Sequence, residues 1–263
     1  MPQCAVLARI GGPALIAILA AGCSASSSPT PSDSVGGSGS SAATLYQKAV
    51  SDAQAARGLR YSVLLSSTAG VTIHLSGDVG RASGLETETI KQAGKSSSVT
   101  VELIGNVLYA TGSAAGLASI PLGVTNVAAA AKFAGRWIAV PPTTPGFAAL
   151  TSALTLASVL GVVKLDHLSH RPGGPYKVDG QAVVELNATQ ASTSGSSRQP
   201  SACVVSVSMA LRPLPVQVTC TQAGGGATVT ITFFDWLPMA AISPPSPTVP
   251  LSKVLASQPA IAH

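Results

Sequence analysis

Two histidines, an aspartate and a serine stand within five residues of one another in Asp166-His167-Leu168-Ser169-His170. These residue types bind metal ions or form parts of catalytic triads, so the segment is the first candidate for a chemical site. Its histidines are three residues apart and lack the glutamate and the i, i+4 spacing of a zinc-protease helix. Because Pro172-Gly173-Gly174 follows at once, we predict a solvated loop with no catalytic or metal role. A site that uses Asp166, His167 or His170 is the alternative.

The rest of the chain lacks other signatures of catalysis. Gly94-Lys95-Ser96 is similar to the end of a phosphate-binding loop, but Thr89 stands where the first glycine of that loop belongs. No Gly-x-Ser-x-Gly motif is present. Glu86 and Glu88 alternate with threonines, which is typical of the solvent face of a strand. We therefore predict a protein that is not an enzyme and that needs no cofactor and no metal.

Cys203 and Cys220 flank a turn signal at Arg212-Pro213-Leu214-Pro215. Pairing the two strand-like runs about this turn predicts three facing pairs on one apolar side: Cys203 with Cys220, Val205 with Val218, and Val207 with Val216. Facing residues of neighbouring strands have Cβ atoms close enough for a disulfide. A metal site is the alternative, but the hairpin contains no histidine. We predict a structural disulfide, which requires an oxidising compartment.

Cys23 ends a short apolar segment. The run from Ile10 to Ala21 has the length of a signal-peptide core and is too short to span a bilayer. Leu19-Ala20-Ala21-Gly22-Cys23 is similar to the lipobox of bacterial lipoproteins, although Ala20 stands where leucine is usual. In those proteins the cysteine is acylated and the chain is cut before it. We expect residues 1–22 to be a signal peptide and Cys23 to anchor the chain to lipid on the outer face of the cell membrane; an ordinary secretory signal is the alternative.

Composition indicates one folded domain behind a tether. Residues 23–41 are almost all Ser, Gly, Pro, Thr and Ala, which predicts a flexible linker. The whole chain has 10% charged and 4% aromatic residues and a mean hydropathy of +0.42, which favours a sheet protein over a disordered one. Its net charge of +5 comes from scattered basic residues, so binding to nucleic acid is excluded. We expect a monomer.

The hydropathy pattern predicts a helix, a long meander of strands, two helices and a second group of strands. The first helix is expected from Thr44 to Arg57 and is capped by Thr44. The expected strands cover Tyr61–Thr68, Val71–Val79, Leu85–Gln92, Val99–Ile104, Val107–Thr111, Arg136–Val140, Gln181–Leu186, the disulfide hairpin and Thr228–Phe234. This order predicts an α+β fold over residues 42–242, with helices on one face of a curved antiparallel sheet. Residues 243–263 are Pro-rich and are expected to form a loose tail.

The middle of the chain is strongly apolar. Val124–Ala134 is expected to be helical, and a second helix is expected from Pro145 to Leu160, capped by Thr144. That second helix is apolar around most of its girth, so it needs cover on several sides or an apolar ligand. Its candidate cavity-lining residues are Phe147, Leu150, Leu154, Leu156, Val159 and Leu160. Packing of all six in an ordinary core is the alternative.

Short phrases spread along the chain resemble one known family. They are Arg60-Tyr61-Ser62-Val63, Gly105-Asn106-Val107-Leu108-Tyr109-Ala110-Thr111, Arg136-Trp137, Val178-Asp179-Gly180-Gln181 and Asp235-Trp236. Together with the order of elements, they resemble the actinobacterial lipoproteins LppX, LprA, LprF and LprG. The resemblance implies a half-barrel sheet with helices covering its concave face, similar to the LolA and LolB carriers. It also implies an acylated lipid as ligand, held between sheet and helices.

Three functions follow from these observations. The first is a non-enzymatic carrier that shields acyl chains of envelope lipids or lipoglycans from water. The second is an envelope module without a cavity that binds a protein or the cell wall, and a distant third is a hydrolase. A cavity of more than about 1,000 Å³ under the helices would favour the carrier over the module.

Overall fold

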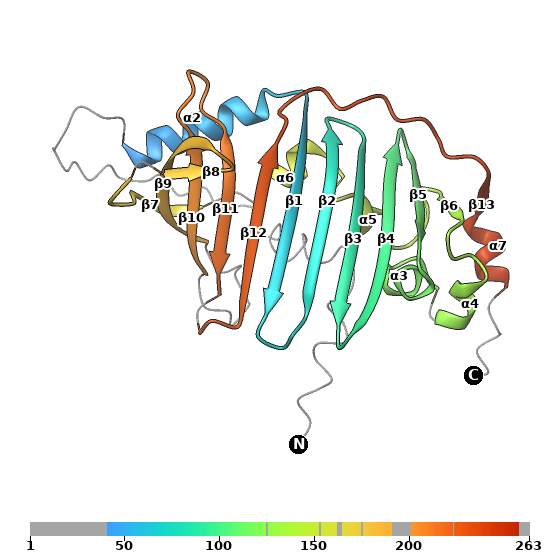
Figure 1. The fold of residues 1–263 in the computed structure, drawn as a ribbon. Coiled ribbons are helices and arrows are strands. Elements are labelled where there is room, and N and C mark those ends of the chain that lie inside the picture. The colour runs from blue at the N-terminus through green and yellow to red at the C-terminus, as the bar shows by residue number, and fades with distance from the viewer. Residues whose placement is uncertain are drawn as a thin grey trace.

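A computed structural model describes residues 41–124, 126–152, 154–161, 165–174, 176–190, 201–222 and 224–257. The signal peptide, Cys23 and the tether predicted above therefore lie outside the described residues, apart from Ser41. The helices, labelled as in Figure 1, are α2 (Ala42–Gln54), α3 (Ala114–Ser119), α4 (Val127–Ala131), α5 (Phe147–Thr151), α6 (Leu156–Gly161) and α7 (Leu251–Ala256). Among these described helices, none has the length and apolar character needed to cross a bilayer.

The strands form one 13-stranded sheet, antiparallel except where β13 joins β6. Its spatial order is β13-β6-β5-β4-β3-β2-β1-β12-β11-β10-β9-β7, and β8 pairs with β9 beside this path. The strands are β1 (Gly58–Ser67), β2 (Thr72–Gly80), β3 (Gly84–Gln92), β4 (Lys95–Ile104), β5 (Val107–Gly112), β6 (Trp137–Val140), β7 (Asp166–His170), β8 (Tyr176–Val178), β9 (Gln181–Gln190), β10 (Ser201–Ser208), β11 (Pro215–Thr221), β12 (Ala227–Phe234) and β13 (Thr248–Pro250).

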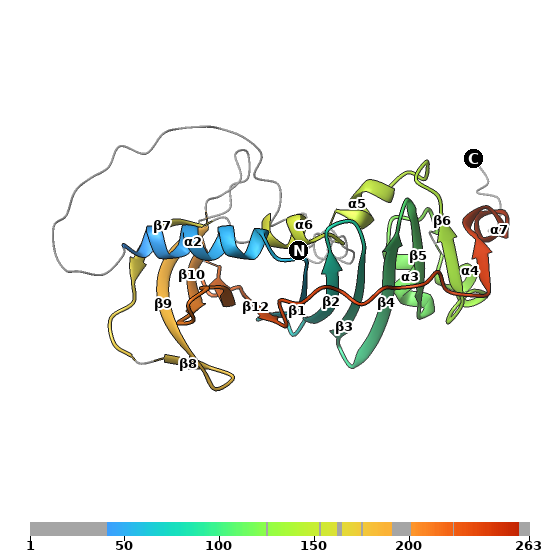
Figure 2. The same cartoon turned by 90° about the horizontal axis from the view of Figure 1, so that it is seen from above.

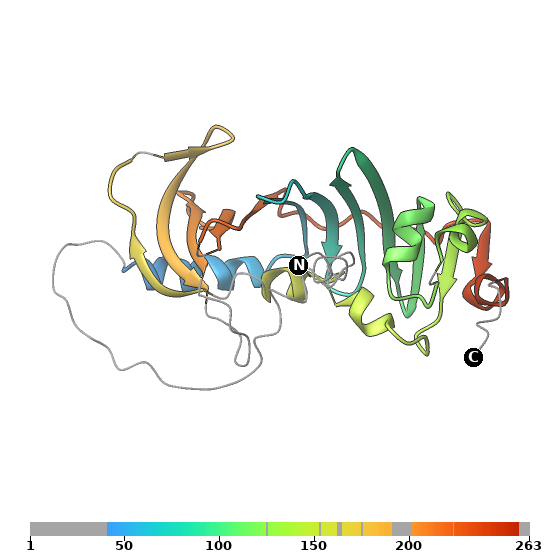
Figure 3. The same cartoon turned by 90° about the horizontal axis from the view of Figure 1, so that it is seen from below.

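The sheet is curved and open, and α2, α5 and α6 lie along one face of it, here called the inner face (Figures 2 and 3). The predicted fold class is confirmed: helices cover the concave side of a curved antiparallel sheet. Two groups of buried side chains fill the space under the helices. The first core joins α2 and α6 to strands β1, β2 and β9–β12. The second core joins α3, α4, α5 and α7 to strands β4–β6 and β13.

The first helix lies close to the sheet because its inner side is made of small residues. Ala49 and Ala53 are fully buried. The helix begins two residues earlier than expected, since Ser41 and not Thr44 is the N-cap: its Oγ accepts from the backbone N–H of Thr44 at 3.1 Å. Arginines from two hairpins hold its other end: Arg212 donates to the carbonyl of Asp52 at 2.5 Å, and Arg81 donates to that of Ala55 at 3.5 Å.

The long helix expected from Pro145 to Leu160 is in fact two short ones, α5 and α6. A left-handed Gly146 (φ 87°), not Thr144, stands at the start of α5. Thr155 starts α6, because its Oγ1 accepts from the N–H of Ser158 and its carbonyl from that of Val159. Between them the backbone of Leu154 lies against Gly84, where any Cβ would collide with the Leu154 carbonyl. A continuous helix would not bring that backbone to the sheet.

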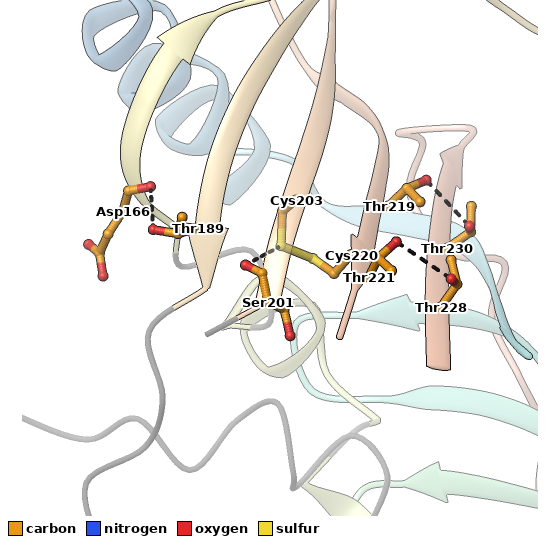
Figure 4. The surroundings of a disulfide bond; sticks show 9 residues. All are labelled: Asp166, Thr189, Ser201, Cys203, Thr219, Cys220, Thr221, Thr228 and Thr230. Atoms are coloured by element: carbon orange, nitrogen blue, oxygen red, sulfur yellow. Dashed lines mark hydrogen bonds between the residues drawn. A yellow bond between two sulfur atoms is a disulfide. The ribbon is translucent and has the colours of Figure 1, made fainter. Parts of the chain in front are cut away.

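The β10–β11 hairpin carries the disulfide between Cys203 and Cys220 (Figure 4), whose Cα atoms are 4.1 Å apart. The predicted pairing of Cys203 with Cys220 and of Val205 with Val218 is confirmed. The third predicted pair is wrong, because a register shift after Ser206 places Val207 opposite Pro215. On the other side of the hairpin, threonine hydroxyls contact those of β12, with Thr219 3.3 Å from Thr230 and Thr221 3.5 Å from Thr228.

The Pro-rich segment after Ser243 is not the loose tail that its composition predicted. Residues 248–250 form β13, which pairs in parallel with β6, and α7 follows directly. Val249, Leu251 and Val254 are buried in the second core. The folded domain therefore extends through α7, because these three side chains complete a core that the first 242 residues leave open. In Figure 1 this segment runs from the end of β12 along the upper edge of the sheet to its far end.

Candidate functional site

A half-open groove of about 910 Å³ lies between α2 and α6. Two helices, the turn between β2 and β3, and the start of β7 contribute its walls. Its lining residues are Tyr46, Gln47, Val50, Ser51, Gln54, Arg81, Leu156, Ala157, Leu160, Gly161, Leu165 and Asp166. None of these lies in the middle of a strand. The groove is therefore between the two helices, and the resemblance had implied a cavity between helices and sheet.

The groove is apolar along one wall and polar along the other. Apolar side chains come mainly from α6 and its surroundings: Leu156, Ala157, Leu160 and Leu165, with Val50 across from them. The amide and hydroxyl groups of Gln47, Ser51 and Gln54 lie along the exposed side of α2. Eight residues of helix separate Tyr46 from Gln54, so the groove extends about 12 Å along α2. These dimensions suit an extended chain with an apolar and a polar side.

The Tyr46 hydroxyl has no hydrogen-bond partner among the described residues, although it is buried. Burial raises the pKa of Tyr46 above its ordinary value, and the negative charge of Asp166 adds to the effect, so the hydroxyl stays protonated. A buried hydroxyl without an acceptor costs about 1–3 kcal/mol. The hydroxyl oxygen is not accessible from the groove, so a ligand oxygen could accept this hydrogen bond and remove the cost only if the Tyr46 side chain shifted.

Opposite charges stand at the two ends of the groove. Arg81 lies at the end where α2 stops, since it binds the carbonyl of Ala55. Asp166 lies at the other end, where it acts on Tyr46. Both side chains are exposed, so each can contact the polar part of a ligand while it stays hydrated. The positive end suits a phosphate or carboxylate, and the end at Asp166 suits hydroxyl groups.

The six candidate cavity-lining residues do not share one site. Leu156, Val159 and Leu160 are all buried in the first core, and Leu156 and Leu160 also line the groove. The residues of the preceding turn belong to the second core: Leu150 and Leu154 are fully buried there, and Phe147 packs against it. The break between α5 and α6 divides the predicted apolar stripe, because each short helix turns its residues to a different core.

The Asp166–His170 segment is an edge strand, β7, and not the loop that its sequence predicted. His167 and His170 are exposed, and His167 has a left-handed backbone (φ 51°) at the register shift of this strand. Within the described part of the chain, no three His, Cys, Asp or Glu side chains are grouped so that they could hold a metal ion. Of this segment, Asp166 alone lines the groove.

The central strand β3 turns two carboxylates inward, and the prediction that Glu86 and Glu88 face solvent is wrong. Glu86 is 2% exposed and Glu88 is 4% exposed. The residues of β3 do alternate between the two faces, but the glutamates lie on the face opposite to the predicted one. Glu86 pairs with Val101 and Glu88 pairs with Leu75, both on the inner face. No residue of β3 belongs to the first or the second core, so β3 separates the two.

Tyr61 reaches Glu86 across a glycine. In the sheet, Gly77 of β2 stands between Tyr61 of β1 and Glu86 of β3. The Tyr61 hydroxyl donates to Oε2 of Glu86 at 2.7 Å. Burial, opposed in part by this hydrogen bond, raises the pKa of Glu86 to about 7, and burial also raises the pKa of Glu88. The Oε1 atom of Glu88 has no hydrogen-bond partner among the described residues.

We expect Gly77→Ala to destabilise the protein by about 2 kcal/mol, which is typical of an overpacked core. A Cβ at this position would lie 2.6 Å from Cε1 of Tyr61, so the ring would have to leave Glu86. Urea unfolding measures the loss. Gly80→Ala on the same strand is the control, since its Cβ would meet no atom closer than 3.5 Å. Equal stability of the two variants would contradict this packing of Tyr61.

Comparison with known proteins gives a likeness in fold. No protein-family model matches the chain, and no curated protein matches it significantly. The structure of lipoprotein LppX from Mycobacterium tuberculosis is 10% identical, with 77% of this chain and 98% of that one covered and a TM-score of 0.49. For LprF from Mycobacterium bovis the identity is 14%, the coverage 78% and 96%, and the TM-score 0.49. The fold is similar to that of mycobacterial lipoproteins.

A LolA superfamily protein from Nitrosomonas europaea is more distant, at 9% identity and a TM-score of 0.28, with 75% of this chain and 93% of that one covered. At such identities the likeness concerns the fold alone. The family that the sequence phrases resemble thus includes two of these similar structures.

Proposed function

We propose that this chain is an exported lipoprotein that binds an acylated lipid in the groove between α2 and α6. Acylation of Cys23 would hold it at the outer face of the membrane that supplies the lipid. The protein would act without catalysis, by shielding part of an acyl chain from water. The apolar wall of the groove, formed by Leu156, Ala157, Leu160 and Leu165, is the observation that carries the proposal.

The energetics agree with such a ligand. Each methylene group buried in the groove contributes about 0.8 kcal/mol. A groove about 12 Å long covers only part of a long acyl chain, so the affinity should be moderate and release into a membrane easy. The polar wall of Gln47, Ser51 and Gln54 would face the glycerol or sugar part of the lipid.

Volume alone does not separate a carrier from an interaction module. The groove of about 910 Å³ is at the upper end of the range for small-molecule sites and just below the size of about 1,000 Å³ set above. Its lining favours the carrier, because the apolar wall of α6 suits an acyl chain and the polar groups of Gln47, Ser51 and Gln54 suit the polar part of a lipid.

Filling the groove tests the proposal. Ala157 is exposed and lines the groove, so Ala157→Trp should displace at least two methylene groups and weaken the binding of a fluorescent phospholipid about tenfold or more. Ala148→Trp is the matched control, because Ala148 is an exposed residue of α5 outside the groove lining. Binding that is equally strong in both variants and in the natural chain would place the lipid elsewhere. No binding in the natural chain would favour the interaction module.

A further inference from the structure

One edge of the sheet gathers exposed apolar side chains. Here the turns between β2 and β3 and between β10 and β11 meet the end of α2 and the segment that follows β12; we call this edge the upper rim (Figure 1). Figure 2 looks directly onto it. Met209 and Leu237 are 63% and 64% exposed, and Leu211 is fully exposed. Trp236, half-buried against Phe233 at 5.8 Å between ring centroids, stands beside Leu237.

The upper rim also carries three exposed arginines, Arg57, Arg81 and Arg212. No carboxylate among the described residues forms a salt bridge with them. The nearby acidic groups are engaged elsewhere: Asp52 binds Lys48 at 2.7 Å, and Arg60 lies between Asp78 and Asp235 at 2.8 and 3.3 Å. The rim thus combines arginines that no described carboxylate neutralises with solvent-exposed apolar side chains.

The rim is held in place by hydrogen bonds to α2. Arg212 follows Leu211 in the β10–β11 turn, and its donation to the carbonyl of Asp52 fixes this turn beside the helix. The backbone N–H of Ser208 donates to the carbonyl of Leu214 and closes the hairpin, and that of Met209 donates to the carbonyl of Ala182 in the neighbouring strand β9. Leu211 is therefore presented outward from a fixed turn, and the end of the groove at Arg81 opens on the same rim.

We propose that the upper rim docks on a membrane that contains anionic lipid, with Met209, Leu211 and Leu237 entering the headgroup region and the three arginines facing lipid phosphates. Apolar side chains flanked by basic ones are the combination that binds such surfaces. The 18 residues from 24 to 41 reach about 60 Å at full extension, so a chain anchored at Cys23 can bring this rim to the same bilayer. The proposal does not depend on what the groove binds.

A fluorescent label at the rim tests the docking. Full chains carrying Cys4→Ser and Cys23→Ser, with the disulfide intact, have one free thiol when Leu211→Cys or Val127→Cys is added. Val127, 52% exposed on α4, is the matched apolar position away from the rim. With vesicles of phosphatidylcholine and phosphatidylglycerol that contain a nitroxide-labelled phospholipid, the label at 211 should be quenched at least about fivefold more than the label at 127.

The charge part of the proposal has its own readouts. Arg57→Glu, or vesicles of phosphatidylcholine alone, should abolish most of the quenching at position 211, and so should high salt. Quenching at 211 that persists unchanged in phosphatidylcholine vesicles would overturn the role of anionic lipid. Equal quenching at both positions, or none at 211, would overturn membrane docking altogether and leave the rim to a protein partner.

Discussion

The natural protein is expected to lose about 3 kcal/mol of stability as the pH rises from 4.5 to 7, and Glu86→Gln is expected to abolish this pH dependence. In the unfolded chain this carboxyl ionises near its ordinary pKa of 4.5, whereas in the folded protein its pKa is about 7. Between these values the folded state binds more protons than the unfolded state, so stability falls as pH rises. The stabilising contribution is complete below pH 4.5 and is lost above pH 7. Glutamine keeps an acceptor for the Tyr61 hydroxyl and has no charge to bury.

Urea unfolding at several pH values measures this effect for the natural chain and for Glu86→Gln. Asp166→Asn serves as the control, because it removes an exposed carboxylate and leaves the buried Glu86 in place. Stability curves of the natural chain and of Glu86→Gln that run parallel from pH 4.5 to 7 would show that Glu86 is not buried as a neutral acid.

Opening the disulfide should cost about 3 kcal/mol, because Cys203 and Cys220 close a loop with a sequence separation of 17. For a domain of this size the melting temperature should fall by roughly 10 °C. Differential scanning fluorimetry with and without dithiothreitol measures the change in the natural chain. The double variant Cys203→Ala, Cys220→Ala should melt at the lower temperature and should not respond to the reductant. A natural chain that melts at the same temperature in both conditions would contradict the structural role of the bond.

The sequence predicted the parts of the fold that depend on local pattern. Alternating apolar residues and turn signals located most strands to within a few residues. The disulfide followed from facing positions in one hairpin. In each case the deciding information lies within about 20 residues of sequence.

Features that depend on distant contacts were missed or misplaced. The alternation of residue types along β3 is compatible with either face of the strand turned inward, and only the neighbouring strands decide that Glu86 faces inward. The break between α5 and α6 is required by the contact of Leu154 with Gly84, which stands 70 residues earlier in the chain. The order of the tail comes from burial of Val249 and Leu251 against β6 and the second core, and composition does not report it.

The candidate site was predicted only in part for the same reason. Leu156 and Leu160, two of the six candidates, line the groove, and their contact with a ligand stays a prediction. Tyr46, Gln47 and Ser51 were missed, because the sequence gives no sign that α2 lies beside α6. Tyr46 becomes a candidate only through the structure, which places it in the groove lining with a hydroxyl that has no partner among the described residues.

Mass spectrometry of lipid co-extracted with the purified protein tests most directly whether the groove between α2 and α6 holds an acylated lipid. The natural chain and Ala148→Trp should yield the same lipid in near-equimolar amount, and Ala157→Trp should yield several-fold less. Natural chain that is correctly folded and disulfide-bonded, yet carries no lipid and takes up none from vesicles, would contradict the proposed function.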